Sequence, residues 1–309
     1  MTSRRFLPTA YCLLLTILLP SVTAHADEVG VLILAHGGSE RWNQVVEETV
    51  AQAQLSEPTE IVFGMGMHPH EVQALQGAVD RLQQRGVTRM VVVPMLVSSA
   101  SEVMRQFHYL LGMRPDGPWQ EHVKPVTLHV TPTMTSTLFD DPPVVAEILL
   151  ERALELSHNP QEETVLLVAH GPNAEEDNQQ WLSAMARIAQ QLREQGDFRA
   201  VLPVTMRDDA PKPIQEEATR QMRALVREHS AEGRVLVVPV LLAQGGIEAK
   251  IPRRLRGLTY AYTGKTLLPH PKLAQWIAQH VQQASTVAAT GEGTPCAPCA
   301  ARARETPQF

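Results

Sequence analysis

The sequence has few aromatic residues and no excess of positive charge. Aromatic side chains make up 5% of the 309 residues, and 27 Lys and Arg stand against 33 Asp and Glu, for a net charge of -6. These two shortages exclude a base-stacking surface and general nucleic-acid binding. Charged residues amount to 19% and hydrophobic residues to 44%, which excludes a disordered, coiled-coil or collagen-like chain. The length predicts roughly two globular domains.

Cysteine is also scarce, with three residues in the whole chain. Cys12 lies in an apolar segment near the N-terminus, and Cys296 and Cys299 form a CxxC pair close to the C-terminus. The pair is typical of a local disulfide or a flexible thiol pair, and the alternative is capture of a soft metal ion. No His follows Cys299, which excludes covalent c-type haem attachment. Residues 286–309 are rich in Ala, Thr, Gly and Pro, and we expect a disordered tail there.

A single long apolar run is present, at residues 6–22. Arg4 and Arg5 precede it, and the small-x-small sequence Ala24-His25-Ala26 follows it. This pattern indicates a secretory signal peptide over residues 1–26, with a retained membrane anchor as the alternative. We therefore expect a periplasmic or secreted protein with no membrane span after cleavage.

The remainder alternates between strand-like and helix-like segments. Continuous apolar runs such as residues 29–35 indicate strands buried on both faces, and most of the predicted strands are followed by a segment of helical periodicity. The pattern predicts an α/β fold with parallel sheets flanked by helices, in two lobes over residues 27–158 and 159–285. Predicted strands are 29–35, 61–65, 90–97, 123–130, 164–169, 199–206, 235–242 and 259–268, and predicted helices are 40–55, 71–84, 101–111, 143–156, 175–194, 214–229 and 272–283.

Two pairs of matching segments indicate that the lobes are an internal duplication. Leu34-Ala35-His36-Gly37 matches Val168-Ala169-His170-Gly171, and Val91-Val92-Val93-Pro94 matches Leu236-Val237-Val238-Pro239. Each segment lies at or near the carboxyl end of a predicted strand, where ligand sites of parallel sheets gather.

An apolar strand ending in Ala-His-Gly, followed by a Val-Val-Val-Pro strand and a Gly/Ser-rich turn, resembles the CbiX/SirB family of sirohydrochlorin chelatases, class II relatives of ferrochelatase. Residues 140–149 and 268–274 resemble the family as well. The resemblance covers most of the chain in both halves. It implies two chelatase-like lobes and insertion of Co²⁺ or Fe²⁺, with Ni²⁺ as a further candidate, into a sirohydrochlorin-like tetrapyrrole in the cleft between them. Such a reaction belongs to cobalamin or sirohaem synthesis and needs no nucleotide cofactor.

The resemblance assigns the metal and the catalytic role to a few residues. His36 matches the family's first catalytic histidine, and His170 is its counterpart in the second half. The family's second metal-binding histidine is missing from both turns, where Glu102 and Glu248 are the nearest ionisable substitutes. Carboxylates can bind a metal ion and accept a proton. The alternatives are strand-capping histidines and first-turn helix acids that favour the helix dipole.

Further residues are candidates for metal and tetrapyrrole binding. His68 and His70 lie in Met65-Gly66-Met67-His68-Pro69-His70, which could hold a metal ion or merely continue the core. Five basic residues follow predicted strand ends and could bind tetrapyrrole carboxylates, or else remain solvated surface charge. These are Arg41, Arg207, Lys250, Arg253 and Arg254.

Other enzyme classes lack their motifs. His36-Gly37-Gly38 resembles a hydrolase oxyanion turn, but no GxSxG is present, and Ala35 and Ala169 stand where a histidine phosphatase needs Arg. Neither GxGxxG nor a Walker-type loop occurs. Two hypotheses remain: an exported metal chelatase in which His36, Glu102 and His170 are catalytic, and a non-catalytic protein that carries a metal ion, haem or corrinoid in the same cleft.

Overall fold

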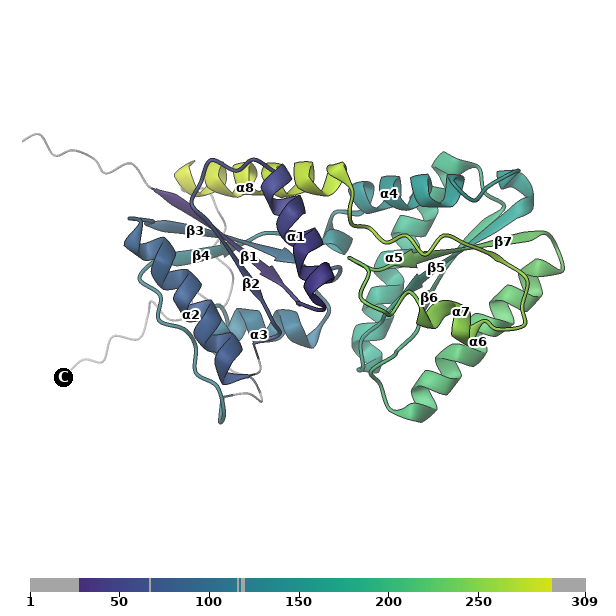
Figure 1. Cartoon of the computed structure of the whole chain (residues 1–309), viewed down its shortest axis with the longest axis horizontal. Helices are drawn as coiled ribbons and strands as arrows, with labels where there is room; N and C mark the ends of the chain where they lie inside the picture. The colour runs from purple at the N-terminus through teal and green to yellow at the C-terminus, as the bar shows by residue number, and fades with distance from the viewer. Residues whose placement is uncertain (1–27, 67, 116, 118–119, 291–309) are drawn as a thin grey trace, which may run out of the picture.

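The protein folds as two parallel β-sheets placed side by side, each covered by helices on both faces (Figure 1). The computed structural model describes residues 28–66, 68–115, 117 and 120–290. The predicted signal peptide, Met67 and the Cys296/Cys299 pair lie outside these residues. The strand order is β2-β1-β3-β4 in the first sheet and β6-β5-β7-β8 in the second, so the predicted duplicated α/β fold is confirmed.

The two sheets have the same parallel pairing. The strands of the first are β1 (Val29–Ala35), β2 (Thr59–Phe63), β3 (Arg89–Met95) and β4 (Thr131–Met134). Those of the second are β5 (Glu163–Ala169), β6 (Ala200–Thr205), β7 (Arg234–Val240) and β8 (Ala261–Tyr262). Ala35 pairs with Met95, and Ala169 pairs with Val240. His36 follows β1 and His170 follows β5, so the two histidines lie at equivalent edges of their sheets.

Helices connect the strands, and two of them begin at a serine cap. Ser39 accepts a hydrogen bond from the Trp42 backbone N–H at 3.3 Å, and Ser101 accepts one from the Met104 N–H at 3.2 Å, the usual role of serine at an N-cap. The α-helices are α1 (Glu40–Gln52), α2 (Pro69–Gln84), α3 (Glu102–Leu110), α4 (Pro142–Leu154), α5 (Glu175–Gly196), α6 (Lys212–Ser230), α7 (Lys250–Arg254) and α8 (Pro271–Thr290), with short 3₁₀ turns at Leu138–Asp140 and Pro160–Glu162.

The structure corrects two predicted strands. Residues 123–130 are irregular chain packed on α3: the Tyr109 hydroxyl donates to the Val123 carbonyl at 2.8 Å, and the Val126 N–H donates to the Leu110 carbonyl at 2.9 Å. These contacts bury Val123 and Val126 without strand pairing, and the next strand, β4, begins only at Thr131. Within the predicted strand 259–268, the structure forms a strand only at Ala261–Tyr262, which is β8.

Other predicted elements lie within a few residues of those observed, with two exceptions. α7 was not predicted. α8 extends to Thr290 and so includes residues 286–290, which the composition had assigned to the tail. Among the described residues, none of the helices combines the length and hydropathy that a bilayer crossing requires.

The last helix of each half covers the sheet of the other half. α4 packs against α5 and β7 of the second sheet, whereas α8, drawn yellow in Figure 1, lies over the first sheet and packs against α1 and β3. The division into lobes over residues 27–158 and 159–285 stays a prediction, and each sheet is completed by a helix from the other half.

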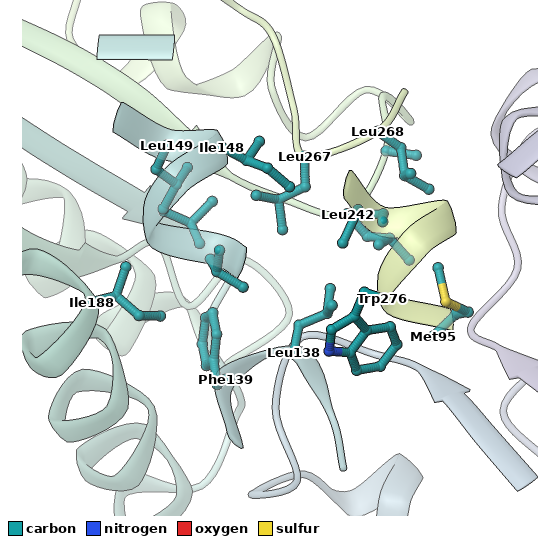
Figure 2. Packing of buried hydrophobic residues seen from close by; sticks show 14 of the residues in the cluster. Met95, Leu138, Phe139, Ile148, Leu149, Ile188, Leu242, Leu267, Leu268 and Trp276 are labelled. Atoms are coloured by element: carbon teal, nitrogen blue, oxygen red, sulfur yellow. The ribbon is translucent and has the colours of Figure 1, made fainter. Parts of the chain in front are cut away.

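This exchange joins both lobes in one hydrophobic core. Alternate residues of β1, namely Val31, Ile33 and Ala35, belong to the same buried cluster as Val165 of β5 and Trp276 of α8. In Figure 2, the Trp276 indole lies among buried side chains that come from both halves. The labelled members of this cluster are Met95, Leu138, Phe139, Ile148, Leu149, Ile188, Leu242, Leu267, Leu268 and Trp276. We refer to it as the shared core.

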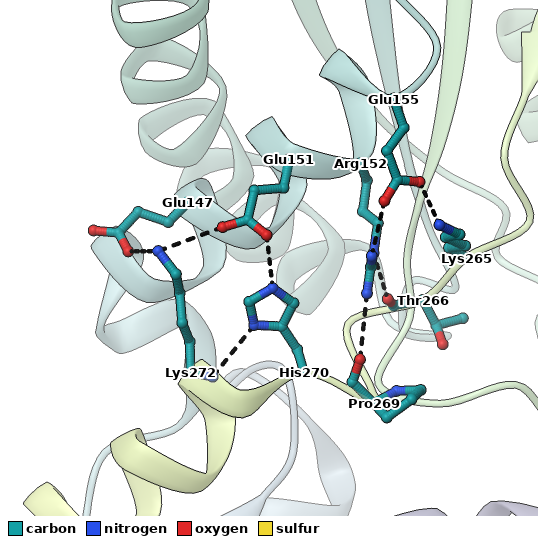
Figure 3. Close-up of polar contacts among 9 residues, drawn as sticks. All are labelled: Glu147, Glu151, Arg152, Glu155, Lys265, Thr266, Pro269, His270 and Lys272. Carbon is teal, nitrogen blue, oxygen red and sulfur yellow. Dashed lines mark hydrogen bonds and ion pairs between the residues drawn. The ribbon is translucent and has the colours of Figure 1, made fainter.

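Polar contacts attach the segment before α8 to α4 (Figure 3). His270 Nε2 lies 2.8 Å from Glu151 Oε2, and the hydrogen bond from His270 lowers the pKa of Glu151. Lys272 Nζ donates to Glu147 Oε2 at 2.5 Å. Arg152 donates to the carbonyl oxygens of Thr266 and Pro269, each at 3.3 Å. These bonds hold the two exchanged helices in register at the junction of the lobes.

Candidate functional site

A cleft of about 520 Å³ lies between the lobes, at the carboxyl ends of the central strands. Both halves contribute to its lining, and the two strand-end histidines face it together. Of the residues that the sequence singled out, His36, Glu102 and His170 line this cleft. The duplicated strand ends therefore converge on one site, as expected for parallel sheets.

The His36 ring is oriented by its own turn. Its Nδ1 lies 2.8 Å from the Gly37 carbonyl oxygen. Because a carbonyl can only accept, we assign the hydrogen to Nδ1, which leaves the Nε2 lone pair available. Imidazole presented through Nε2, with its other nitrogen bonded to a carbonyl, is a frequent arrangement in metal ligands.

His170 repeats this geometry and adds a carboxylate. Its Nδ1 lies 2.8 Å from the Gly171 carbonyl oxygen, and its Nε2 lies 3.2 Å from Asp209 Oδ2. With Nδ1 protonated, Nε2 and the carboxylate attract one another only through a second proton or a cation between them. Two ligand atoms of a tetrahedral divalent ion are about 3.4 Å apart, so the observed spacing suits a shared metal ion as well as an ion pair.

Asp208 completes the cluster but is already engaged. The ligand atoms of His170, Asp208 and Asp209 all lie within 4.8 Å of one another. Asp208 Oδ2 accepts from Lys250 at 2.5 Å, and Oδ1 accepts from Arg254. Burial alone would raise the pKa of Asp208, but these two cations outweigh it and lower that pKa. Asp208 therefore anchors the loop after β6, and Asp209 is the residue that presents a carboxylate to the cleft.

Sequence reasoning missed both aspartates. The available signal was an Asp-Asp pair directly after a predicted strand of the second half, at the edge where His170 was expected. Arg207, the residue before the pair, is buried and donates to the Pro172 and Asn173 carbonyls at 2.7 and 2.6 Å. It also pairs with Glu175 at 2.6 Å and lowers the pKa of that carboxyl. Arg207 thus fixes the loop that carries His170.

The glycine after each histidine is required by the turn. Gly37 and Gly171 have φ values of +80° and +76°, in the left-handed region that favours glycine. A Cβ at Gly171 would lie 2.6 Å from Thr205 Cβ of the neighbouring strand. The close approach of this turn to β6 places His170 beside the Asp208 and Asp209 loop.

Replacing Gly171 with alanine is expected to lower the free energy of unfolding by about 1–3 kcal/mol and to weaken metal binding, because the turn must move. Gly257→Ala is the matched control, since Gly257 has φ +80° and nothing within 4 Å of the added Cβ. Chemical denaturation and Co²⁺ titration of both variants provide the measurement. Equal losses in the two variants would show that crowding against Thr205 has no role.

The two glutamates differ in their environment. Glu102 is the first residue of α3, is exposed and lines the cleft. Glu248 instead accepts hydrogen bonds from the backbone N–H groups of Gly245 at 3.1 Å and Gly246 at 2.9 Å. It caps its own turn and is absent from the cleft lining.

His68 and His70 are exposed at the start of α2 and do not line the cleft. Their rings stack with centroids 5.6 Å apart. The His68 N–H donates to Glu71 Oε2 at 3.1 Å, as in a capping box. The structure therefore separates these histidines from His36 and His170.

None of the five predicted cations lines the cleft. Arg207 lies against the loop that carries His170, and Lys250 and Arg254 bind Asp208. Arg41 is exposed, with its guanidinium 3.5 Å from Gln44, and Arg253 is exposed on α7.

A different arginine lies in the cleft. Arg105 of α3 binds Asp177 of α5 through two parallel bonds of 2.9 and 2.8 Å, and this pairing raises the pKa of the guanidinium. Trp181 Nε1 donates to the Ala100 carbonyl at 2.7 Å. These bonds cross from one lobe to the other and close one wall of the cleft.

Comparisons with known proteins agree with this architecture. The family model described as CbiX matches residues 30–156 and again 164–284, one match for each half. A search of curated proteins found no match. Among solved structures, SirB from Bacillus subtilis with Fe3+ is similar, with a TM-score of 0.61 and 16% identity over 85% of this chain and 98% of that one.

A second similar structure is DR2241 from Deinococcus radiodurans, a multi-domain protein with structural similarity to chelatases. It has a TM-score of 0.49 and 20% identity over 83% of this chain and 55% of that one. At 16% identity the SirB structure bears on the fold alone, and the family model shows the family. With both halves matched by one family model, the chain belongs to the CbiX family.

Proposed function

We propose that this protein inserts a divalent metal ion into a tetrapyrrole in the cleft between its lobes. The observation that carries the proposal is the convergence of His36 and His170 on one cleft, with Nδ1 of each bound to a glycine carbonyl. This leaves Nε2 of His36 available and places Nε2 of His170 beside Asp209. The position of Asp209 beside His170 adds a carboxylate ligand. Membership of the CbiX family supports a chelatase-like, tetrapyrrole-binding role.

The reaction exchanges one metal ion for two protons. His170 and Asp209 hold the incoming ion, and His36 faces them from the first lobe. As the macrocycle nitrogens replace these ligands, two pyrrole N–H protons must leave, and each needs a base within reach. Glu102, exposed on the cleft wall, and His36 are suited to accept them.

The ligand set favours ions of borderline hardness. Imidazole and carboxylate suit Fe²⁺, Co²⁺ and Ni²⁺, whereas soft ions such as Cu⁺ prefer thiolate or thioether ligands. Co²⁺ and Fe²⁺ are therefore the first substrates to test, with Ni²⁺ as a third. Sirohydrochlorin is the macrocycle that the family suggests first.

Loss of a metal ligand should reduce both binding and insertion. His170→Ala and Asp209→Asn are expected to weaken Co²⁺ binding at least about tenfold and to slow metal insertion by a similar factor. Insertion is followed by absorbance with metal-free sirohydrochlorin and, separately, with a dicarboxylic porphyrin. His129→Ala is the matched control, because His129 is exposed and lies outside the cleft lining.

The outcome separates catalysis from carriage. Metallated product formed over many turnovers supports the chelatase. Stoichiometric binding of a metal ion or tetrapyrrole without turnover would favour the carrier hypothesis instead, and full activity of His170→Ala would contradict the proposed site.

We also propose that residues 1–26 are a cleaved signal and that the mature protein is periplasmic or secreted. The basic residues, apolar run and Ala24-His25-Ala26 support this. The mass of the protein recovered from the exported fraction tests it: a chain beginning at Asp27 is expected, and retention of Met1 would contradict cleavage.

A further inference from the structure

The charge of the cleft is unusual for a site that receives an acidic macrocycle. Among the described residues of its lining, Arg105 is the single lysine or arginine, and Glu102, Asp177 and Asp209 are acidic. Arg105 is held by Asp177 through two bonds. The arginine of the lining is thus neutralised by an acid from the other lobe, and Asp209 lies beside His170. No lysine or arginine of the described lining is left to pair with a carboxylate of a ligand.

The walls of the cleft are mainly apolar. The first half contributes a methionine from the end of β3 and the apolar residues that follow it, and the second half contributes the equivalent residues after β7. A tryptophan from each half, Trp42 and Trp181, also lines the cleft. The apolar lining residues include Met65, Met95, Leu96, Val97, Val103, Val240, Leu241, Leu242, Ala243 and Ile247. A flat apolar ring system matches such walls, because its burial removes apolar surface from water.

Carboxylates within this cleft would be unfavourable. Desolvating a carboxylate beside other acids, with no unengaged lysine or arginine in the described lining, is unfavourable because neither its hydration nor its charge is replaced. A macrocycle with carboxylates around its whole perimeter cannot enter without bringing some of them inside. A macrocycle with its acids along one edge can leave them in the solvent at the mouth.

We infer that the cleft takes a tetrapyrrole whose carboxylates lie along one edge, such as a dicarboxylic porphyrin, in preference to one that carries them on every ring, such as sirohydrochlorin. The inference rests on the proposed function, since it names the substrate class of the same site. Its basis is the apolar lining together with the three acids and the single, engaged arginine.

The test compares macrocycles that share a ring system. The full chain is titrated with metal-free mesoporphyrin, which is dicarboxylic, and with uroporphyrin, which is octacarboxylic, and binding is read from porphyrin fluorescence. Mesoporphyrin is expected to bind at least about tenfold more tightly at low salt. Raising the salt concentration should tighten uroporphyrin binding by screening the repulsion and leave mesoporphyrin binding nearly unchanged.

A charge variant tests whether the acids of the cleft cause the preference for mesoporphyrin. Glu102→Gln removes one acid from an exposed position and preserves side-chain shape, and it should tighten uroporphyrin binding about threefold or more with little effect on mesoporphyrin. Glu121→Gln is the matched control, since Glu121 is exposed and outside the cleft lining. An equal gain in both variants would mean that net charge, and not the cleft, governs selection.

The outcomes distinguish this inference from the proposed function. Metallation of sirohydrochlorin together with equal or tighter binding of uroporphyrin would overturn the inference and leave the chelatase standing. Failure to bind or metallate any of the three macrocycles would overturn both. Preferential binding and metallation of the dicarboxylic porphyrin would support both.

Discussion

Replacing Trp276 with alanine is expected to lower the free energy of unfolding by about 3–5 kcal/mol, the usual loss when a large buried aromatic side chain is removed. Trp276 is 2% exposed and belongs to the shared core. Its Nε1 donates to Asp141 Oδ2 at 2.9 Å. Because α8 comes from the second half and packs on the first sheet, the loss should destabilise both lobes together. Urea denaturation followed by circular dichroism measures it.

Trp276→Phe is the control for this prediction. Phenylalanine retains most of the apolar area but loses the bond to Asp141, so its cost should be about 1 kcal/mol plus a small packing loss. Both variants should unfold in one transition. Two separate transitions in the wild-type protein, with only one shifted by Trp276→Ala, would contradict a shared core.

Replacing Asp208 with asparagine is expected to lower the free energy of unfolding by about 2–3 kcal/mol at neutral pH, because Lys250 and Arg254 lose their common partner. The Asp208 side chain is 7% exposed and that of Arg254 is 13% exposed. Water therefore solvates poorly the positive charge that the substitution leaves unpaired. Lys250 is 43% exposed, which keeps the loss below that of a fully buried pair. Thermal denaturation of the two proteins measures the difference.

The loss of stability caused by Asp208→Asn should be present at neutral pH and disappear in acid. The lowered pKa of Asp208 means that its contribution is present above the ordinary carboxyl value of about 4 and is lost as pH falls through the lowered pKa. Wild type and Asp208→Asn should therefore differ by a constant amount from pH 7 to about pH 5 and converge at lower pH. Glu217→Gln, which removes an exposed pair with Arg220, is the control and should leave the unfolding midpoint unchanged. Divergence of the curves on acidification would contradict the role assigned to Asp208.

Much of the fold is readable from the sequence because buried parallel strands have a strong signature. Residues 29–35 are apolar without interruption, since both faces of β1 are covered. Residues 123–130 instead mix apolar with polar residues. Their buried members, Val123 and Val126, pack on α3, and periodicity cannot distinguish such packing from strand pairing. The exchange of α4 and α8 was also unpredictable, because an amphipathic pattern does not specify which sheet a helix covers.

The sequence predicts those site residues whose position is determined by the end of a strand. His36, Glu102 and His170 line one cleft because their elements end or begin at equivalent sheet edges. Arg207 also follows a strand, yet it has a φ of 53° and its bonds to residues 172–175 direct it to the loop that carries His170. Asp209 and the Arg105–Asp177 pair depend on contacts between distant segments, which one sequence does not reveal.

The exchanged helices have a consequence for synthesis on the ribosome, where the chain appears from its N-terminus. The second sheet can be covered as soon as it forms, since α4 precedes it in the chain. The first sheet must wait, because the helix that completes its inner face, Pro271–Thr290, is the last helix that the structure describes. Strands β1 to β4 are made early, and on that side α1 covers only part of them until α8 has emerged. A nascent chain lacking α8 therefore exposes apolar surface of the first sheet, which needs protection until that helix has been made.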